Sequence, residues 1–394
     1  MRLFAGIVLL AGSGVLFAAT EPESIAVGGA ELIPTIRIQH QHDDNIFSSA
    51  IREESSTITN LTPRLEYLAE KDANNRLSIS YDGDWARYWQ SRDDDYIDHT
   101  FTIAGAYSGN DSYKLKVDAA TAKLHDNRGE GASEGVGGIT RTEPDEYDQD
   151  TFSVGLDLGK EGARFGAYFG VDTLAKEYTN NRNATRFRDR DDRGFVARLF
   201  TRISGKTRGF IGYRNTDIEY SSLTASGVTL DSDESSVLAG VEWEATGKTT
   251  GSLEVGRLTK DFDEPGSEEQ DLTVWNLGVQ WAPREYSIVS FNTVRDAAET
   301  NGIGAYIEQT NHTVNWVHGW SERISSTIAA TIGDDEYPGS TREDDRADYT
   351  IGVDYDWQRW ASIGFRMQYS DRDSNVDLFD FDRRRIFVTL DLSL

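Results

Sequence analysis

Histidines are the residues of this chain that most readily suggest chemistry, because an imidazole beside a hydroxyl or a carboxylate can act as a general base. His40 and His42 precede two aspartates at 43–44, an arrangement that could bind a metal ion but is more common as a plain polar rim. His312 and His318 have no obvious nucleophile at a productive spacing. The sequence therefore predicts neither an enzyme nor a bound metal or other cofactor.

The acidic segment 371–377 is a second candidate for chemistry, because it places an oxygen-bearing side chain at every second position. Calcium loops use this spacing. The segment lacks the glycine at loop position 6 and the glutamate at position 12 that an EF-hand requires. We therefore interpret it as a solvated acidic loop, or as one that is bridged by divalent cations to lipopolysaccharide phosphates.

The elements that must position these residues are short segments in which apolar and polar side chains alternate. Near the C-terminus, Ile386, Val388 and Leu390 share one face, and Thr389 and Asp391 share the other. About 18 segments of roughly ten residues repeat this period of two, which is typical of strands with one face toward lipid and one toward a lumen. The sequence therefore predicts an all-β fold, a transmembrane antiparallel β-barrel.

The connections between these segments alternate between short turns and long acidic loops. Outer-membrane barrels have short periplasmic turns and long extracellular loops, so this alternation predicts the orientation. We count 18 strands, an even number that returns both termini to the periplasm, although the irregular first two segments also allow 16. The long loops are expected at 126–145, 178–192, 221–234, 261–270 and 371–382.

The composition agrees with a barrel and excludes several other classes of protein. The 394 residues carry a net charge of −27, which argues against nucleic acid as a partner because phosphates require clustered Lys and Arg. The absence of cysteine excludes disulfides, thiolate metal sites and acylation on Cys. The 9 Trp, 17 Tyr and 17 Phe suffice for two aromatic girdles at the membrane interfaces.

The N-terminus has the features of a secretory signal peptide. One basic residue, Arg2, precedes an apolar run that ends at small residues. The run is shorter than the ~20 residues that a membrane-spanning helix needs, which disfavours the alternative of a membrane anchor. We therefore divide the chain into a signal peptide (1–20), a short periplasmic N-terminal segment (21–32) and a barrel (33–394).

Charged residues of both signs fall on the polar face of the predicted strands. A mixed-charge lumen suits a polyhydroxylated chain, which needs hydrogen-bond donors and acceptors along its path but no deep binding pocket. The alternative for each residue is that it pairs across strands and stabilises the wall. Arg198, Arg202 and Arg214 fall on neighbouring strands and could form a basic ladder for acidic sugars. The candidate substrate path comprises Arg37, Arg64, Lys114, Lys116, Arg164, Arg198, Arg202, Arg214, Arg366, Asp354 and Asp356.

Three elements in the N-terminal third resemble those of a known family. The run HDDNIF at 42–47 resembles an Asp-Asp-Asn element followed by a hydrophobic and an aromatic residue, LTPRL at 61–65 resembles a Leu-x-Pro-x-Leu element, and the aromatic stretch 81–99 resembles a third. Together they are similar to the β-barrel porin 2 family, the EpsL-type outer-membrane barrels found with exopolysaccharide operons. The residues carried over are Asp43, Asp44, Asn45, Phe47 and Pro63.

Within these motifs the residue types also predict local structure. Asp43 and Asn45 are expected to shape a turn at the rim of the barrel rather than to contact substrate. Pro63 falls inside a predicted strand, where it has no N–H to donate to the neighbouring strand. We therefore expect it to lie at a bulge or beside an irregular pairing.

The resemblance implies an outer-membrane channel that takes part in the export of an exopolysaccharide or capsule-type polymer. The expected partners are outer-membrane lipid and lipopolysaccharide, a polysaccharide or oligosaccharide substrate, periplasmic export and synthesis proteins, and the barrel-assembly machinery. We expect a monomer in the outer membrane of a Gram-negative bacterium.

Two alternatives to export stay open. One is a general or sugar-selective diffusion porin, and the other is a structural or adhesin-like barrel whose acidic loops face other cells. An exporter should have a lumen with little constriction, whereas a diffusion porin should have a loop, such as residues 126–145, folded inside to narrow the passage. The position of that loop therefore discriminates between the first two functions.

Overall fold

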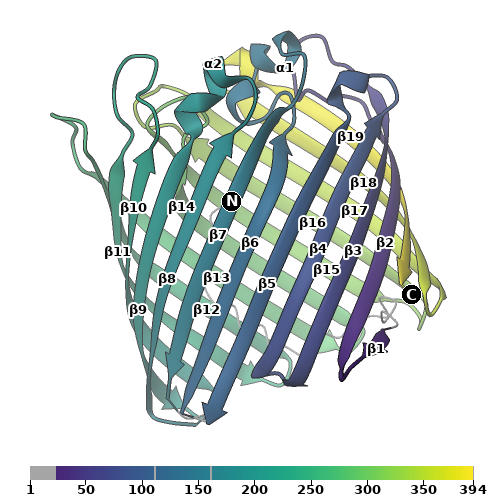
Figure 1. The fold of residues 1–394 in the computed structure, drawn as a ribbon, viewed down its shortest axis with the longest axis vertical. Coiled ribbons are helices and arrows are strands. Elements are labelled where there is room, and N and C mark those ends of the chain that lie inside the picture. The colour runs from purple at the N-terminus through teal and green to yellow at the C-terminus, as the bar shows by residue number, and fades with distance from the viewer. Residues whose placement is uncertain (1–23, 111, 160–161, 394) are drawn as a thin grey trace.

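The described part of the chain forms one closed β-barrel (Figure 1). The computed structural model describes residues 24–110, 112–159 and 162–393, so the expected signal peptide lies outside the described residues. Eighteen long strands each pair antiparallel with the next, and the last pairs with the first. The predicted 18-stranded antiparallel barrel is confirmed, and the alternative of 16 strands is wrong.

The strands that form the ring are 13 to 17 residues long. A bilayer is crossed by roughly 9–11 tilted strand residues, so the strands extend beyond the membrane. A short strand, β1 (Ile25–Val27), precedes the ring and pairs with its first strand. The ring consists of β2 (Ala30–Asp43), β3 (Ser56–Asp72), β4 (Asn75–Tyr88), β5 (Tyr96–Asn110), β6 (Tyr113–Asp126), β7 (Asp145–Leu158), β8 (Phe165–Tyr178), β9 (Arg190–Ser204), β10 (Thr207–Tyr220), β11 (Ser232–Thr246), β12 (Thr249–Phe262), β13 (Gln270–Arg284), β14 (Ser287–Glu299), β15 (Tyr306–Gly319), β16 (Ile324–Glu336), β17 (Glu343–Gln358), β18 (Ala361–Ser374) and β19 (Phe381–Ser393).

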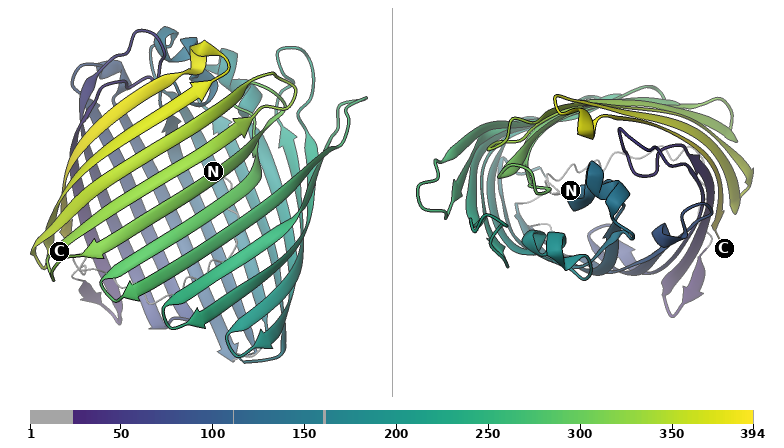
Figure 2. Two further views of the ribbon diagram at one scale, coloured as in Figure 1. Left: turned by 180° about the vertical axis from the view of Figure 1, so that it is seen from behind. Right: turned by 90° about the horizontal axis from the view of Figure 1, so that it is seen from above.

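Closure of the ring joins the two ends of the sequence. β19 pairs with β2 from Arg385 opposite Asp43 to Ser393 opposite Thr35. An open sheet edge in lipid would leave backbone N–H and C=O groups without partners, so this pairing allows the sheet to occupy a bilayer. Both β1 and the end of β19 lie at the rim that carries the short turns (Figure 2).

The opposite rim carries the long loops and the short helices (Figure 2). Outer-membrane barrels place long loops outside the cell, so we describe this rim as extracellular and the other as periplasmic. Among the described residues, no helix has the length and apolar character needed to cross a membrane. The helices are α1 (Val136–Thr140) and α2 (Arg182–Thr185), with single 3-10 turns η1 (Arg92–Asp94), η2 (Gly131–Ser133), η3 (Arg186–Arg188) and η4 (Asp377–Phe379).

Alternation along the strands separates a lipid face from a lumen face. On β17 and β18 the apolar residues Ile351, Val353, Phe365 and Met367 are all exposed, as expected for side chains that face lipid. The residues of the other parity, which include the polar Thr350 and Arg366, face the lumen. Exposed aromatic residues cluster toward the periplasmic ends of the strands, where an interfacial girdle belongs: Trp281, Tyr286, Trp320, Trp357 and Trp360.

Pro63 interrupts the pairing of β3 with β4. The pairing runs to Leu61 and resumes at Arg64, so the two residues between them have no partner on β4. Because proline has no backbone N–H, it cannot take part in a regular pairing on that side.

The extracellular end of the β14–β15 hairpin turns away from the wall. The pairing of β13 with β14 stops at Trp275 opposite Arg295. Beyond that point, Ala297 and Tyr306 pack into a buried apolar cluster with side chains of the three preceding strands. The hairpin end therefore lies over the inner face of β11–β13, whose contribution to the cluster is Leu238, Leu258, Leu272 and Val274.

A buried ammonium group holds the same hairpin in place. Lys260 on β12 has no exposed side-chain surface, and its Nζ lies 2.8 Å from Glu234 Oε1 and 3.0 Å from Glu299 Oε1. Glu299 is the last residue of β14, so the ion pair joins the hairpin to the wall. The inward bend is thus fixed by both apolar packing and charge.

We predict that a charge on the lipid face destabilises the barrel and that the same charge on the lumen face does not. Ile351 lies in the middle of the lipid-facing residues of β17, so Ile351→Lys should lower the free energy of unfolding by about 2–4 kcal/mol. Thr350→Lys, one residue away on the lumen face, is the matched control. Denaturant titration of both variants folded into lipid vesicles measures the difference, and equal losses would contradict the assignment of the faces.

Candidate functional site

The long loop between β6 and β7 turns into the mouth of the barrel. Residues 127–144, called the inner loop below, contain η2 and α1. Viewed from above, the short helices lie within the ring of strands (Figure 2). The contacts described next show that this loop crosses from β6 and β7 to the loop before β17 and to the inner faces of β18 and β19.

The first part of the inner loop is held by Arg128. Its Nε donates to Asp94 Oδ1 at 2.6 Å and its Nη2 donates to Ser91 Oγ at 3.0 Å, which ties the loop to η1 and the residue before it. Its guanidinium also lies 4.1 Å from the ring centroid of Phe47. Charge-assisted hydrogen bonds of this kind are among the strongest in proteins, so this end of the loop is firmly placed.

Gly129 allows the inner loop to approach the backbone at Phe47. Its φ is +87°, a region that favours glycine, and a Cβ atom there would lie only 1.7 Å from the carbonyl oxygen of Phe47. A larger residue would therefore push the loop away from the 44–55 segment. Ser133 stabilises the turn that follows, because its Oγ accepts the N–H of Gly129 at 3.0 Å and donates to the carbonyl of Glu130 at 2.8 Å.

A second contact forms between the inner loop and β19. Arg383 Nη1 lies 3.8 Å from Glu130 Oε1. The same guanidinium binds Asp43 at the end of β2, with Nη2 at 2.5 Å from Oδ2 and Nε at 3.0 Å from Oδ1. Asp43 is fully buried, whereas the Glu130 side chain is about half exposed, so Arg383 joins a buried ion pair within the closing strand pair to a more exposed one with the loop.

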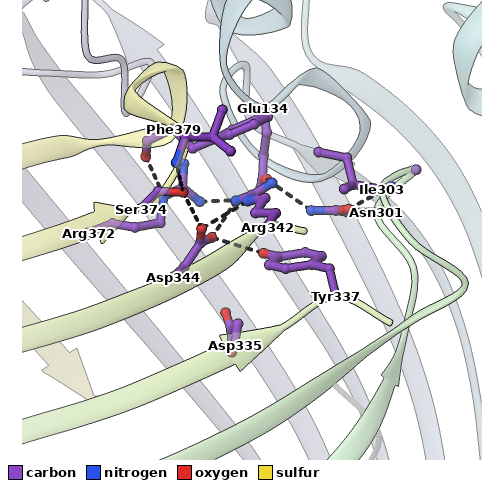
Figure 3. Close-up of polar contacts among 12 residues, drawn as sticks. Glu134, Asn301, Ile303, Asp335, Tyr337, Arg342, Asp344, Arg372, Ser374 and Phe379 are labelled. Carbon is purple, nitrogen blue, oxygen red and sulfur yellow. Dashed lines mark hydrogen bonds and ion pairs between the residues drawn. The ribbon is translucent and has the colours of Figure 1, made fainter. Parts of the chain in front are cut away.

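The third and most extensive contact is made by Glu134 (Figure 3). Its Oε2 accepts hydrogen bonds from Arg342 Nη1 at 2.8 Å and Asn301 Nδ2 at 2.9 Å, and its Oε1 accepts one from Arg372 Nη1 at 3.2 Å. We call Arg342 and Arg372 the arginine pair. One carboxylate of the inner loop therefore joins three different segments: the loop before β17, strand β18 and the β14–β15 connection.

The surroundings of Arg342 fix its guanidinium. It donates to Asp344 from Nε at 2.9 Å and from Nη2 at 2.5 Å. It also lies between two rings, 4.3 Å from the centroid of Tyr337 and 3.7 Å from that of Phe379. Burial opposes the charge, but the hydrogen bond to Asp344 and the charge of Glu134 raise the pKa of Arg342 above its ordinary value. The group therefore stays cationic.

These contacts place the inner loop inside the lumen. The exposed apolar residues of β18, Ile363, Phe365 and Met367, have odd numbers, so Arg372 faces the lumen. On β19 the exposed Ile386 and Val388 have even numbers, which places Arg383 on the lumen face as well. A loop that contacts both side chains must cross the interior of the barrel.

The sequence-predicted arginines on the N- and C-terminal strands lie on the wall below this loop. Arg37 Nε is 2.5 Å from Asp391 Oδ1, and Arg366 Nη2 is 3.3 Å from Asp354 Oδ1. Arg64 contacts two carboxylates, at 2.7 Å on Asp82 and 3.1 Å on Glu66. Each therefore pairs with a neighbouring strand, and Asp356 lies opposite Ser362 at the periplasmic end of β17.

Of the three predicted basic residues on β9 and β10, two also form ion pairs with carboxylates of other strands. Arg198 Nη2 lies 3.0 Å from Glu254 Oε2, and Arg214 Nη2 lies 2.9 Å from Asp172 Oδ2. Arg202 is exposed near the periplasmic end of β9, opposite Arg208 of β10.

The remaining predicted basic residues lie near the periplasmic turns. Lys116 is 3.7 Å from Asp157, and Lys114 donates to Asn74 Oδ1 at 2.8 Å. Arg164 lies in the turn before β8.

The motif residues 43–47 form the rim turn after β2. Asn45 donates from Nδ2 to the carbonyls of Ser49 and Asp382, both at 3.0 Å. Asp44 accepts the N–H of Arg384 at 2.6 Å. Phe47 is buried beneath Arg128 and Gly129, so this turn supports the inner loop.

The lumen wall formed by β13–β16 has amides and hydroxyls in place of charges along its middle. Asn292 donates to Asn276 Oδ1 at 3.2 Å, and the Thr313 and Thr331 hydroxyls are 3.0 Å apart. Such side chains can donate to and accept from hydroxylated solutes without attracting one sign of charge. The lumen therefore has a neutral polar wall and a charged wall.

Sequence reasoning identified the inner loop as a segment but missed the side chains that hold it. These side chains lie in different loops and strands: Glu134, Arg342 and Arg372. They hold the loop only because the fold brings them together. A local signal did exist: the run from Gly129 to Gly138 contains five glycines in ten residues. That composition favours a compact turn-rich loop over an extended one.

The comparisons with known proteins agree with this architecture. The barrel is similar to OpdO of Pseudomonas aeruginosa, with a TM-score of 0.50, 12% identity and coverage of 93% of this chain and 98% of OpdO. It is also similar to OccK2 (OpdF) of Pseudomonas aeruginosa, with a TM-score of 0.50, 11% identity and coverage of 94% and 100%. At these identities the likeness concerns the fold alone.

No curated protein matches the sequence. The model of the family described as "Putative beta-barrel porin 2" matches residues 18–394, nearly the whole chain. This match confirms the resemblance suggested by the N-terminal motifs. The chain belongs to this family of β-barrel porins.

Proposed function

We propose that the protein is an outer-membrane diffusion porin for small polar solutes such as sugars and sugar acids. The observation that carries this proposal is the inner loop, which crosses the mouth and is held on the opposite wall through Glu134. An infolded loop narrows a barrel to a size that small solutes pass and long chains do not. Porins are channel proteins, so no catalytic step is part of the proposal.

The chemistry of the lumen supports polar solutes. The neutral wall of β13–β16 supplies amides and hydroxyls, and the charged wall supplies ion pairs such as Arg37–Asp391 on β2 and β19. A hydroxylated solute can exchange hydrogen bonds with both walls as it moves, without one deep binding pocket. The exposed Arg202 near the periplasmic end adds a cationic group to this path.

Export of an exopolysaccharide is the second candidate, favoured by the motifs at 42–47 and 61–65. A polymer chain would require the inner loop to leave the mouth, which means breaking the contacts of Arg128, Glu130 and Glu134. These contacts support our proposal of a diffusion porin as the resting activity.

The family and fold support an outer-membrane location, and the oligomeric state and partners are part of our proposal. We place the chain in the outer membrane of a Gram-negative bacterium, as a monomer inserted by the barrel-assembly machinery and surrounded by lipid and lipopolysaccharide. Periplasmic export and synthesis proteins would be partners only under the second candidate.

We predict that removal of the inner loop widens the channel. Replacing residues 131–140 with a short Gly-Ser linker removes Glu134 and α1, and should raise single-channel conductance in a planar bilayer. It should also let larger oligosaccharides enter proteoliposomes in a swelling assay. The matched control shortens the β10–β11 loop at 222–228, where the described hydrogen bonds join residues of this segment to one another.

Two outcomes would contradict the porin proposal. If proteoliposomes of the wild-type protein stay impermeable to glucose, the resting channel does not conduct small solutes. If the wild-type channel admits long oligosaccharides as freely as the variant without the inner loop, the loop is not a constriction and export becomes the better candidate.

The arginines of β9 and β10 generate a second prediction about charge preference. Changing Arg198, Arg202 and Arg214 to Gln should slow the entry of an acidic sugar such as glucuronate while leaving glucose entry unchanged, because only the acidic sugar is attracted to cationic side chains. The swelling rates of proteoliposomes in glucuronate and in glucose give the ratio of the two entry rates. An unchanged ratio would remove the basic ladder from the mechanism. Because Arg198 pairs with the buried Glu254, its loss could disturb folding, so the folding of the variant is checked by its heat-modifiable mobility on gels.

A further inference from the structure

The arginine pair forms a built site for a carboxylate, and the protein's own Glu134 occupies it. Arg342 and Arg372 have side-chain exposures of only 1% and 8%. Both direct a guanidinium N–H to the same carboxylate, and Asn301 adds a third donor (Figure 3). Planar guanidinium groups converging on one carboxylate are the usual way in which proteins recognise carboxylates.

The site is more than a structural ion pair, because its donors are held without Glu134. Arg342 is fixed by Asp344 and by the rings of Tyr337 and Phe379. Arg372 is fixed by a 2.7 Å hydrogen bond from its Nε to the carbonyl of Phe379. If Glu134 leaves, the two guanidiniums therefore stay in position with an open anion site between them.

One N–H donor of the arginine pair has no acceptor in the described part of the chain, so the site could bind a ligand with one acceptor more than Glu134 supplies. The Nη2 atom of Arg372 is buried and has no hydrogen-bond partner among the described residues. A buried donor without a partner is costly, so a ligand that satisfies it gains free energy relative to Glu134. A carboxylate beside a ring oxygen and ring hydroxyls, as in a uronic acid, offers such an additional acceptor.

We infer that the arginine pair binds the carboxylate of a small acidic solute, such as a sugar acid, in place of Glu134, and that this exchange releases the η2–α1 part of the inner loop, residues 131–140, from strand β18 and the loop before β17. The inference rests on the proposed porin function and names its solute class. Glu134 then acts as an internal competitor. A group tethered by a short flexible segment has an effective concentration on the order of millimolar, so the solute should act in that range.

The experiment follows the loop directly with a spin label. The chain contains no cysteine, so a single cysteine introduced by Val136→Cys can be labelled uniquely; Val136 is 44% exposed on α1. The labelled protein in lipid vesicles is titrated with sodium glucuronate at constant ionic strength. We expect the mobile fraction of the spectrum to rise, with a midpoint on the order of millimolar. Glucose, the neutral counterpart, should cause no change.

Matched variants separate the carboxylate from general effects of charge. Glu134→Gln removes the competitor, so its spectrum should be mobile before any addition and should not respond to glucuronate. Glu143→Gln makes the same charge change in the same loop, where only the backbone carbonyl of Glu143 forms a described contact, and should behave like the parent. Inorganic phosphate is the third probe, because guanidinium pairs also bind phosphate.

Several outcomes would overturn the inference. The first is a spectrum that stays unchanged at glucuronate concentrations about a hundredfold above the effective concentration of Glu134. The second is a spin label that stays immobile in the Glu134→Gln variant. The third is an equal spectral response to glucuronate and to glucose. An equal response to phosphate would overturn the assignment to carboxylates.

A swelling assay on the same vesicles separates this inference from the proposed function. Glucose entry without any spectral response refutes the carboxylate exchange and leaves the porin standing. A spectral response in vesicles that admit neither sugar supports the binding site and refutes the porin.

Discussion

The pairing of β19 with β2 is the constraint on which the rest of the structure depends. A bilayer offers no water to backbone N–H and C=O groups, so the sheet is viable there only as a closed ring. Closure sets the alternation of lipid and lumen faces around the whole circumference. It also gives the loops a common rim, and only on that rim can the inner loop reach from β6 to β18.

Charge inside the barrel serves two different purposes. Along the wall, arginines such as Arg37 and Arg64 pair with carboxylates on adjacent strands, so much of their positive charge is neutralised within the sheet. At the mouth, the arginine pair instead binds a carboxylate from a distant loop. The net charge of −27 does not reveal this division, because it counts residues without regard to the face or rim on which they lie.

The sequence predicted the barrel well because strand alternation is a local property. Residues 386–393 identify a strand and its lipid face without reference to any other segment, and the same holds for most of the ring. The placement of Glu134 could not be predicted in this way. Its partners Arg342 and Arg372 are 208 and 238 residues away, and the inward bend of the β14–β15 hairpin that brings Asn301 to it depends on packing among five strands.

The closure of the ring by its first and last strands also has a consequence for biosynthesis. From Thr35 to Asp43, β2 must remain unpaired on one side until β19, the last strand of the ring in sequence order, pairs with it. A chain that stops early would present two bare edges, and each could recruit a strand from another molecule. Closure of the ring is therefore conditional on the synthesis of β19, which makes its nine residues paired with β2 a checkpoint for the integrity of the barrel.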